Sequence, residues 1–191
     1  MNTVLKVLEE MKAVCSNVVP EDYESFVKLL KEDKRFFFTG EGRSGLVVKA
    51  IAIRLMHSGK TVYVLGETTT PAIQENDILI VLSGSAKTGQ TISFSENASK
   101  SGAKVFLITT NKEAINQPCF TGGMHIPAAT KYRLSGEPDT IQPLGNQFDQ
   151  AAHLILDAAI IDSLSERNSN EERNLGKGIT IASTVHQFLT N

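Results

Sequence analysis

Residues 36–45, FFFTGEGRSG, join a short apolar run to a turn that contains three glycines. The glycines at positions 40, 42 and 45 have the spacing G-x-G-x-x-G, and a long apolar-periodic segment, 44–60, follows directly. An apolar strand, a glycine-rich turn and an amphipathic helix in this order are the building unit of a parallel α/β sheet. The stretch therefore predicts the fold class, and it raises the question of what the turn binds.

Further apolar runs, bounded by glycine or by polar turn residues, continue this alternation toward the C-terminus. Continuous apolar runs are typical of parallel strands that are buried on both faces. We therefore predict a three-layer α/β/α sandwich with a parallel sheet of about five strands. The expected strands are 35–40, 61–67, 78–83, 104–111 and 122–128, and the expected helices beside 44–60 are 87–103 and 141–168, the last behind a Pro–Gly loop.

The ends of the chain have a different pattern. Residues 1–34 are expected to form two amphipathic helices that pack on the domain or swap onto it, the second opening at Pro20. Residues 35–170 form the predicted domain, and 171–191 are a tail whose pattern fits either a short strand or a loosely held arm. A chain of 191 residues is long enough for one such domain with a real core.

Composition excludes several functional classes. The formal net charge of −2 gives no electrostatic support for a nucleic-acid or membrane partner. Cys15 and Cys119 form no C-x-x-C motif, and the four histidines have no metal-ligand spacing, so we expect reduced thiols, no metal and a cytoplasmic protein. No apolar run approaches the roughly 20 residues that span a bilayer.

The glycine spacing fits a dinucleotide site. It lies between a strand and a helix, and Glu67 closes the next strand at about the position where such sites carry an acid. Arg43 and Ser44 argue for a different ligand, because these side chains can reach an anion at the mouth of the turn.

A second polar loop, 83–91, follows the strand expected at 78–83 and has the sequence SGSAKTGQT. Hydroxyl groups at the N-terminus of a helix offer O–H donors beside free backbone N–H groups, and together they form a cup for one phosphate. The same residues also fit a serine cap and an ordinary turn. The candidate phosphate contacts are Ser83, Gly84, Ser85 and Thr88.

A third segment, GETTTPAI at 66–73, follows another expected strand, so Glu67 and Thr68 are expected at the same rim of the sheet. It fits either a wall that hydrogen-bonds a polyol or a threonine-rich turn stopped by Pro71. Crevices at the carboxyl ends of parallel strands are where open α/β sheets bind ligands.

Five motifs in this order, GEGRSG, RLMHSG, GETTTPAI, ILIVLSGSAKT and PLGNQFDQAAHLILDAAI, resemble the sugar isomerase (SIS) domain family and, within it, the 6-phospho-3-hexuloisomerases. The resemblance covers about residues 5–170. It implies a flavodoxin-like sandwich, usually as a homotetramer. It also implies an enzyme that converts D-arabino-hex-3-ulose 6-phosphate into fructose 6-phosphate through a cis-enediol, with no cofactor.

The resemblance assigns roles residue by residue. The phosphate loop of the family, S-G-S-G-x-T, has Ala86 at its fourth position here, which would strain the loop if that position needs a positive φ. Ser44 matches the serine that helps to hold the sugar phosphate. Arg43 beside it is suited to neutralise phosphate or enediolate charge, because its planar fork matches both.

Two departures from the family bear on catalysis. Where relatives have a glutamate considered a candidate base, GNQFDQ has Asp149, which we expect to be the base, with Glu67 as the second candidate. The terminal H-A-N-L-E signature is missing, since Glu172 and Gly176 stand at its ends, and His186 is the nearest substitute. The alternative function is therefore a SIS-domain protein that binds a sugar phosphate without turning it over, or one with a different sugar-phosphate specificity.

Overall fold

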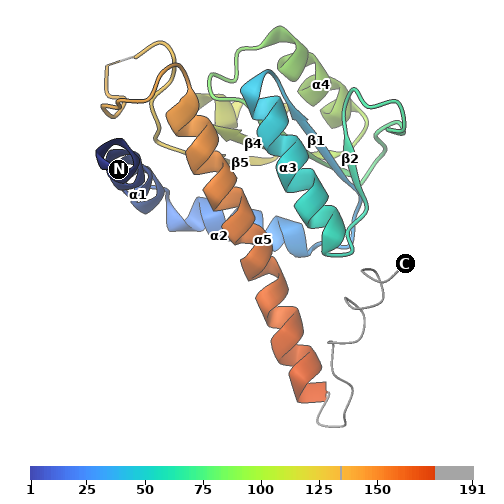
Figure 1. Cartoon of the computed structure of the whole chain (residues 1–191). Helices are drawn as coiled ribbons and strands as arrows, with labels where there is room; N and C mark the ends of the chain where they lie inside the picture. The colour runs from blue at the N-terminus through green and yellow to red at the C-terminus, as the bar shows by residue number, and fades with distance from the viewer. Residues whose placement is uncertain (134, 175–191) are drawn as a thin grey trace.

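The computed structural model in Figure 1 describes residues 1–133 and 135–174. Its sheet is all-parallel, with strand order β2-β1-β3-β4-β5. This is the flavodoxin-like order, so the predicted fold class is confirmed. The strands are β1 (Phe36–Gly40), β2 (Val62–Val64), β3 (Ile78–Leu82), β4 (Lys104–Thr109) and β5 (Gly122–His125).

Helices cover both faces of the sheet. On one face α2, α3 and α5 pack against the strands, and α1 packs on α5. On the opposite face lie α4 and a short 3₁₀ helix, η1. The bounds are α1 (Asn2–Ser16), α2 (Pro20–Lys31), α3 (Arg43–His57), α4 (Gly89–Lys100), η1 (Lys112–Asn116) and α5 (Asn146–Asn174).

The strands are continuous apolar runs because both faces of the sheet are buried. Phe36 and Phe38 point to the α3–α5 side and Phe37 to the α4 side, and all three are fully buried. Successive side chains of a strand alternate between the faces, so a sheet covered on both faces needs apolar residues at every position.

The largest differences from the predicted elements are at the edges. The segment expected as a strand at 61–67 keeps only three strand residues, because β2 is an edge strand paired with β1 alone and is only half-buried. Helix α5 begins at Asn146, directly behind the Pro–Gly loop as expected, and ends at Asn174, beyond the predicted domain boundary at residue 170. The predictions for tail residues 175–191 lie outside the described residues.

Two glycines of the opening stretch have separate structural roles. Gly42 has φ of 58°, which allows the chain to turn from β1 into α3. A Cβ on Gly45 would lie 2.7 Å from the carbonyl oxygen of Gly40, so a side chain there would force α3 away from the strand. The strand-to-helix turn itself thus explains the G-x-G-x-x-G spacing.

Candidate active site

A cavity of about 310 Å³ opens at the carboxyl edge of the sheet, where β1 and β3 end. Its walls come from the β1–α3 turn, the β3–α4 loop, the long connection between β5 and α5, and the first turn of α5. This is the edge at which the sequence predicted ligand binding. The lining residues are Glu41, Arg43, Ser44, Leu82, Ser83, Gly84, Ser85, Thr88, Thr130, Lys131, Tyr132, Leu144, Gly145, Phe148 and Asp149.

Asp149 is the most enclosed charged group of this cavity, with only 6 % of its surface exposed. One carboxylate oxygen accepts a hydrogen bond from the Ser44 hydroxyl at 2.9 Å, and the other accepts one from Arg43 Nε at 3.2 Å. The Arg43 side chain is more than half exposed. Residues about 105 positions apart are therefore joined, because α3 and α5 both begin at this edge.

The loop that follows β3 is folded back on itself by short-range hydrogen bonds. The Ser83 hydroxyl accepts from the Ala86 amide at 3.2 Å, and the Ser85 hydroxyl accepts from the Lys87 amide at 3.3 Å. Thr88 is the N-cap residue of α4, with no side-chain cap hydrogen bond. The free N–H groups and positive dipole end of α4 therefore adjoin the hydroxyls, as a phosphate cup requires.

The same loop is fixed to the neighbouring strand through one carbonyl group. The Gly84 carbonyl oxygen accepts hydrogen bonds from the hydroxyls of Thr109 and Thr110, at 3.0 and 2.8 Å. On the other side, a Cβ on Gly84 would lie 3.4 Å from the ring of Phe148. The loop is thereby held between the end of β4 and the start of α5, next to Asp149.

Ala86 has φ of 53°, in the left-handed region that favours glycine. The fourth position of the loop therefore has the positive φ at which an alanine is strained. The methyl group is buried, with 3 % of the residue exposed, and it packs on the α4 side of the core. The strained residue lies between Ser85 and Thr88, inside the candidate phosphate loop.

Glu67 and Thr68 are not among the residues that line this cavity. They follow β2, which lies on the far side of β1 from β3. The Glu67 carboxylate forms an ion pair with Lys49 at 2.6 Å, and both side chains are about half exposed. The single chain does not bring these two residues to Asp149, and their role in the site stays a prediction.

The cavity wall formed by the 126–145 segment, which joins β5 to α5, was not predicted from the sequence. This segment contributes five of the lining residues, among them a cation, Lys131, and Thr130, which is 8 % exposed. Only its position after a parallel strand could have indicated the site, since the segment has no apolar periodicity.

Of the residues discussed for the missing terminal signature, Glu172 lies within α5, whereas Gly176 and His186 are outside the described residues.

A family model described as the SIS domain matches residues 29–142. The 3-hexulose-6-phosphate isomerase of Mycobacterium gastri is 35 % identical over 174 residues, which cover 91 % of this chain and 86 % of the relative. The protein with the same name from Bacillus subtilis is 30 % identical, over 88 % of this chain and 91 % of its own.

Solved structures show the same fold. The crystal structure of a hypothetical protein has a TM-score of 0.76 and 28 % identity, covering 96 % of this chain and all of its own. A hypothetical protein from Methanococcus jannaschii, described as a 3-hexulose-6-phosphate isomerase by inference, has a TM-score of 0.71 at 23 % identity, covering 94 % and 97 %. The described part of the chain contains no helix that is long and apolar enough to cross a membrane.

Proposed function

Because this chain belongs to the SIS domain family, we propose that it is the phosphosugar isomerase that interconverts D-arabino-hex-3-ulose 6-phosphate and fructose 6-phosphate. The observation that carries the proposal is the enclosure of a buried carboxylate, Asp149, in one cavity with the loop 83–88. An isomerase of this class needs a phosphate anchor and a base in the same cavity.

The proposed reaction moves a carbonyl group between adjacent carbons. Asp149 takes the proton from C2 of the 3-ketose, and the electron pair moves to O3, which gives a cis-enediolate. Protonation at C3 and transfer of the O2 proton to O3 leave the carbonyl at C2. Positive charge beside the developing oxyanion lowers the barrier, and Arg43 lies in the cavity beside Asp149.

Substrate binding is proposed to start at the phosphate. Ser83, Ser85, Thr88 and the α4 N-terminus hold the phosphate, and the carbon chain extends toward Asp149 along the wall formed by Thr130 and Tyr132. Ser44 donates to the Asp149 carboxylate and fixes one oxygen, which leaves the carboxylate aimed in one direction. An aspartate reaches about one methylene less far than glutamate, so this fixed position matters for the rate.

The decisive experiment is turnover of hexulose 6-phosphate by the wild type beside Asp149→Asn, with fructose 6-phosphate read by a coupled enzyme. Loss of the base is expected to lower kcat by about 10²–10⁴-fold. Glu96→Gln is the control, since Glu96 is exposed on α4, on the other face of the sheet, and should keep wild-type activity. An Asp149→Asn protein with undiminished kcat would remove Asp149 from the role of base.

A second candidate function is sugar-phosphate binding without turnover. It is favoured by the absence of the terminal histidine, whose position is held by Glu172. In this case the wild type would bind fructose 6-phosphate, measured by calorimetry, and would form no product from the hexulose. Measurable turnover by the wild type excludes this alternative.

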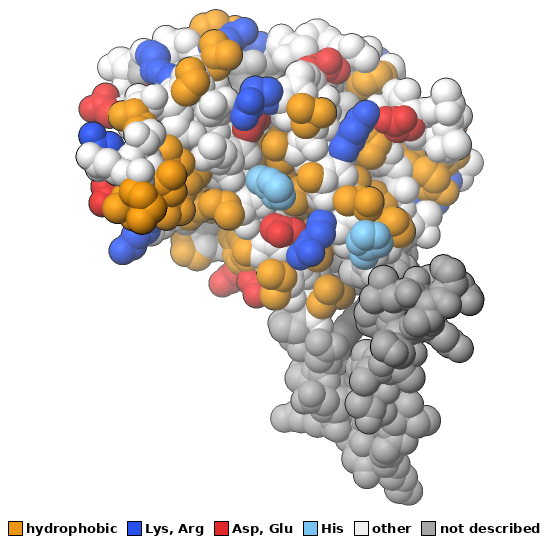
Figure 2. All heavy atoms as spheres, viewed as in Figure 1, with side chains coloured by type: hydrophobic (Ala, Val, Ile, Leu, Met, Phe, Trp, Pro, Cys, Tyr) orange, Lys and Arg blue, Asp and Glu red, His pale blue; other side chains and the backbone are white. Residues whose placement is uncertain are grey.

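We further propose a cytoplasmic homo-oligomer, with a tetramer favoured. Figure 2 shows hydrophobic side chains spread over the face that α3 and α5 form in Figure 1. Exposed apolar surface of this extent is typical of interaction surfaces, and a neighbouring subunit could supply the acid–base group that this tail lacks. The exposed side chains on these helices include Leu46, Ile53, Met56, Leu154 and Ile161.

A further inference from the structure

The carboxylate of Glu10, on the N-terminal helix α1, accepts hydrogen bonds from residues that lie far away in the sequence. Glu10 Oε2 accepts hydrogen bonds from the Thr140 hydroxyl at 2.6 Å and from Gln142 Nε2 at 3.0 Å. Glu10 Oε1 accepts from the Ile141 amide at 2.8 Å. The two oxygens therefore hold three consecutive residues of the 126–145 segment, which is the cavity wall that the sequence did not reveal.

A fourth donor extends this contact into α5. Gln147 is almost fully buried, with 1 % exposed, and its Nε2 donates to Glu10 Oε2 at 3.3 Å. The other end of the same amide, Gln147 Oε1, accepts from the Ala129 amide at 2.7 Å. Gln147 thus ties the start of the wall segment to Glu10, and it stands two residues before Asp149.

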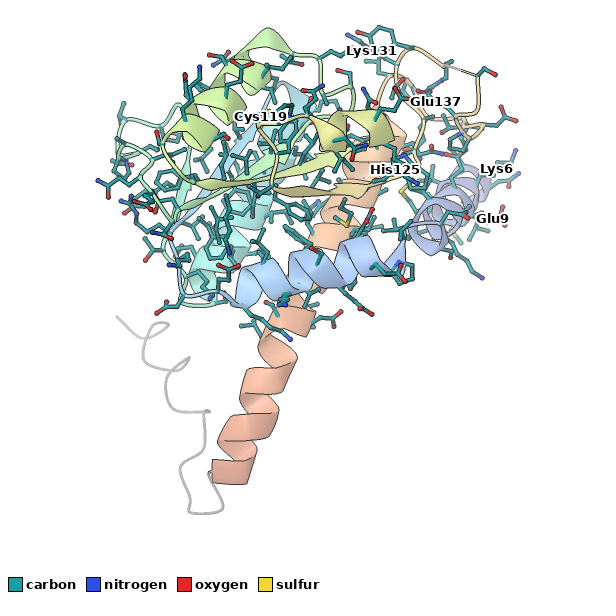
Figure 3. The ribbon with its side chains drawn as sticks, turned by 180° about the vertical axis from the view of Figure 1, so that it is seen from behind. Lys6, Glu9, Cys119, His125, Lys131 and Glu137 are labelled. Carbon is teal, nitrogen blue, oxygen red and sulfur yellow. The ribbon has the colours of Figure 1, made fainter. Side chains whose placement is uncertain are left out.

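Most other hydrogen bonds of the segment are internal, apart from the Ile126 amide, which donates to the Thr109 carbonyl oxygen of β4 at 2.9 Å. The Arg133 guanidinium donates to the carbonyl oxygens of Gln142 and Leu144, at 2.5 and 3.0 Å. Glu137 accepts from the amide and the hydroxyl of Thr130, at 2.9 and 2.6 Å. Figure 3 shows Glu137 and Lys131 on this loop beside α1, which carries Lys6 and Glu9.

We infer that Glu10 is a positioning residue, which fixes the cavity wall and the first turn of α5 so that Lys131, Tyr132 and Asp149 face the bound sugar phosphate. The carboxylate acts through Gln147 and through residues 140–142, and it does not line the cavity. Burial would raise the pKa of Glu10, but its four hydrogen bonds outweigh burial and lower the pKa, so the acceptor stays charged near neutral pH. This inference rests on the proposed isomerase function.

The test compares Glu10→Gln with Glu10→Asp, and with Glu9→Gln as the matched control, because Glu9 is exposed on the same helix. Assays run well below the melting temperature of every variant. In Glu10→Gln one acceptor oxygen becomes an N–H₂ group facing donors, and a displacement of about 1 Å near the base is expected to lower kcat about 10²-fold. Glu10→Asp keeps the charge and should recover part of this loss.

A second readout separates positioning from general damage. Among the described residues, the hydrogen bonds that the Glu10 carboxylate accepts come from residues 140–147 and not from the loop 83–88, so inorganic phosphate should bind Glu10→Gln with unchanged affinity while kcat falls. Equal kcat in Glu10→Gln and Glu9→Gln would overturn the inference, and so would a parallel loss of phosphate affinity.

If the wild type has no isomerase activity, the proposed function fails, and amide hydrogen exchange then tests the positioning role. Faster exchange of the Ile141 amide in Glu10→Gln alone supports that role, and unchanged exchange refutes it.

Discussion

Ala86 shows how one residue can carry strain inside the loop 83–88 at the cavity. Its left-handed backbone costs an alanine about 1–2 kcal/mol relative to glycine. A glycine would remove a buried methyl group, which costs the folded state about 0.8 kcal/mol. It would also raise the conformational entropy of the unfolded chain, which costs a further 0.4–1 kcal/mol, roughly. These terms nearly cancel, so the position tolerates alanine at little net cost.

Substitutions at Ala86 test this balance. Ala86→Gly should change the free energy of unfolding by less than about 1 kcal/mol, measured by urea denaturation. Ala86→Val places a β-branched residue at positive φ in a packed site and should destabilise by roughly 2 kcal/mol or more. Equal stability of the two variants would show that residue 86 does not hold its left-handed conformation.

At the scale of elements, the end of α2 depends on a lysine from another segment. Lys60 is 9 % exposed, and its Nζ donates to the carbonyl oxygens of Lys31 and Glu32, at 3.3 and 2.5 Å. The last carbonyls of a helix have no intrahelical partner. A cation here both satisfies these carbonyls and faces the negative end of the helix dipole.

Lys60→Met keeps the apolar stem and removes the donor. The variant should lose about 1–3 kcal/mol of unfolding free energy, because the carbonyls at the end of α2 lose a charged hydrogen-bond donor. Lys28→Met, at an exposed position in the last turn of the same helix, should stay within about 0.5 kcal/mol of the wild type. Equal midpoints for the two variants in urea would show that Lys60 does not cap α2.

The elements also differ in how well the sequence predicts them. The buried strands β1, β3 and β4 were predictable because each is an unbroken apolar run between turn residues. The position of the polar loop 83–88 at the cavity was predictable because its hydroxyls directly follow such a strand. The 126–145 wall was not, since its conformation depends on Glu10, more than 100 residues away, and on left-handed Arg133 and Leu144.

At the scale of the whole molecule, stability should fall in acid because of His125. Burial, helped by Lys112, lowers the pKa of His125, although the Thr110 carbonyl and Asp22 oppose this. The unfolded chain, with a pKa of about 6.5, then binds the proton more readily than the folded chain. This contribution to stability is complete above about pH 6.5 and is lost as the pH falls through the lowered pKa.

Urea titrations at pH 7 and pH 5 measure this effect. His125→Gln should have a smaller drop in unfolding free energy between the two values than the wild type, because glutamine does not titrate. His153→Gln, at an exposed position of α5, should keep the wild-type drop. A separate loss of unfolding free energy is expected below about pH 4.3, because the unfolded chain then protonates Glu10 more readily than the folded chain does. The same pH dependence in all three proteins would exclude His125 as its source.

The contacts of Glu10 also set an order of events during synthesis and folding. Thr140 is 130 residues from Glu10 along the chain, and closing so long a loop is slow compared with pairing neighbouring strands. The N-terminal helix leaves the ribosome early and has to wait for the segment that it will hold. After dilution from denaturant, the sheet should therefore form first, and enzymatic competence should return later, when the first helix meets the completed C-terminal half.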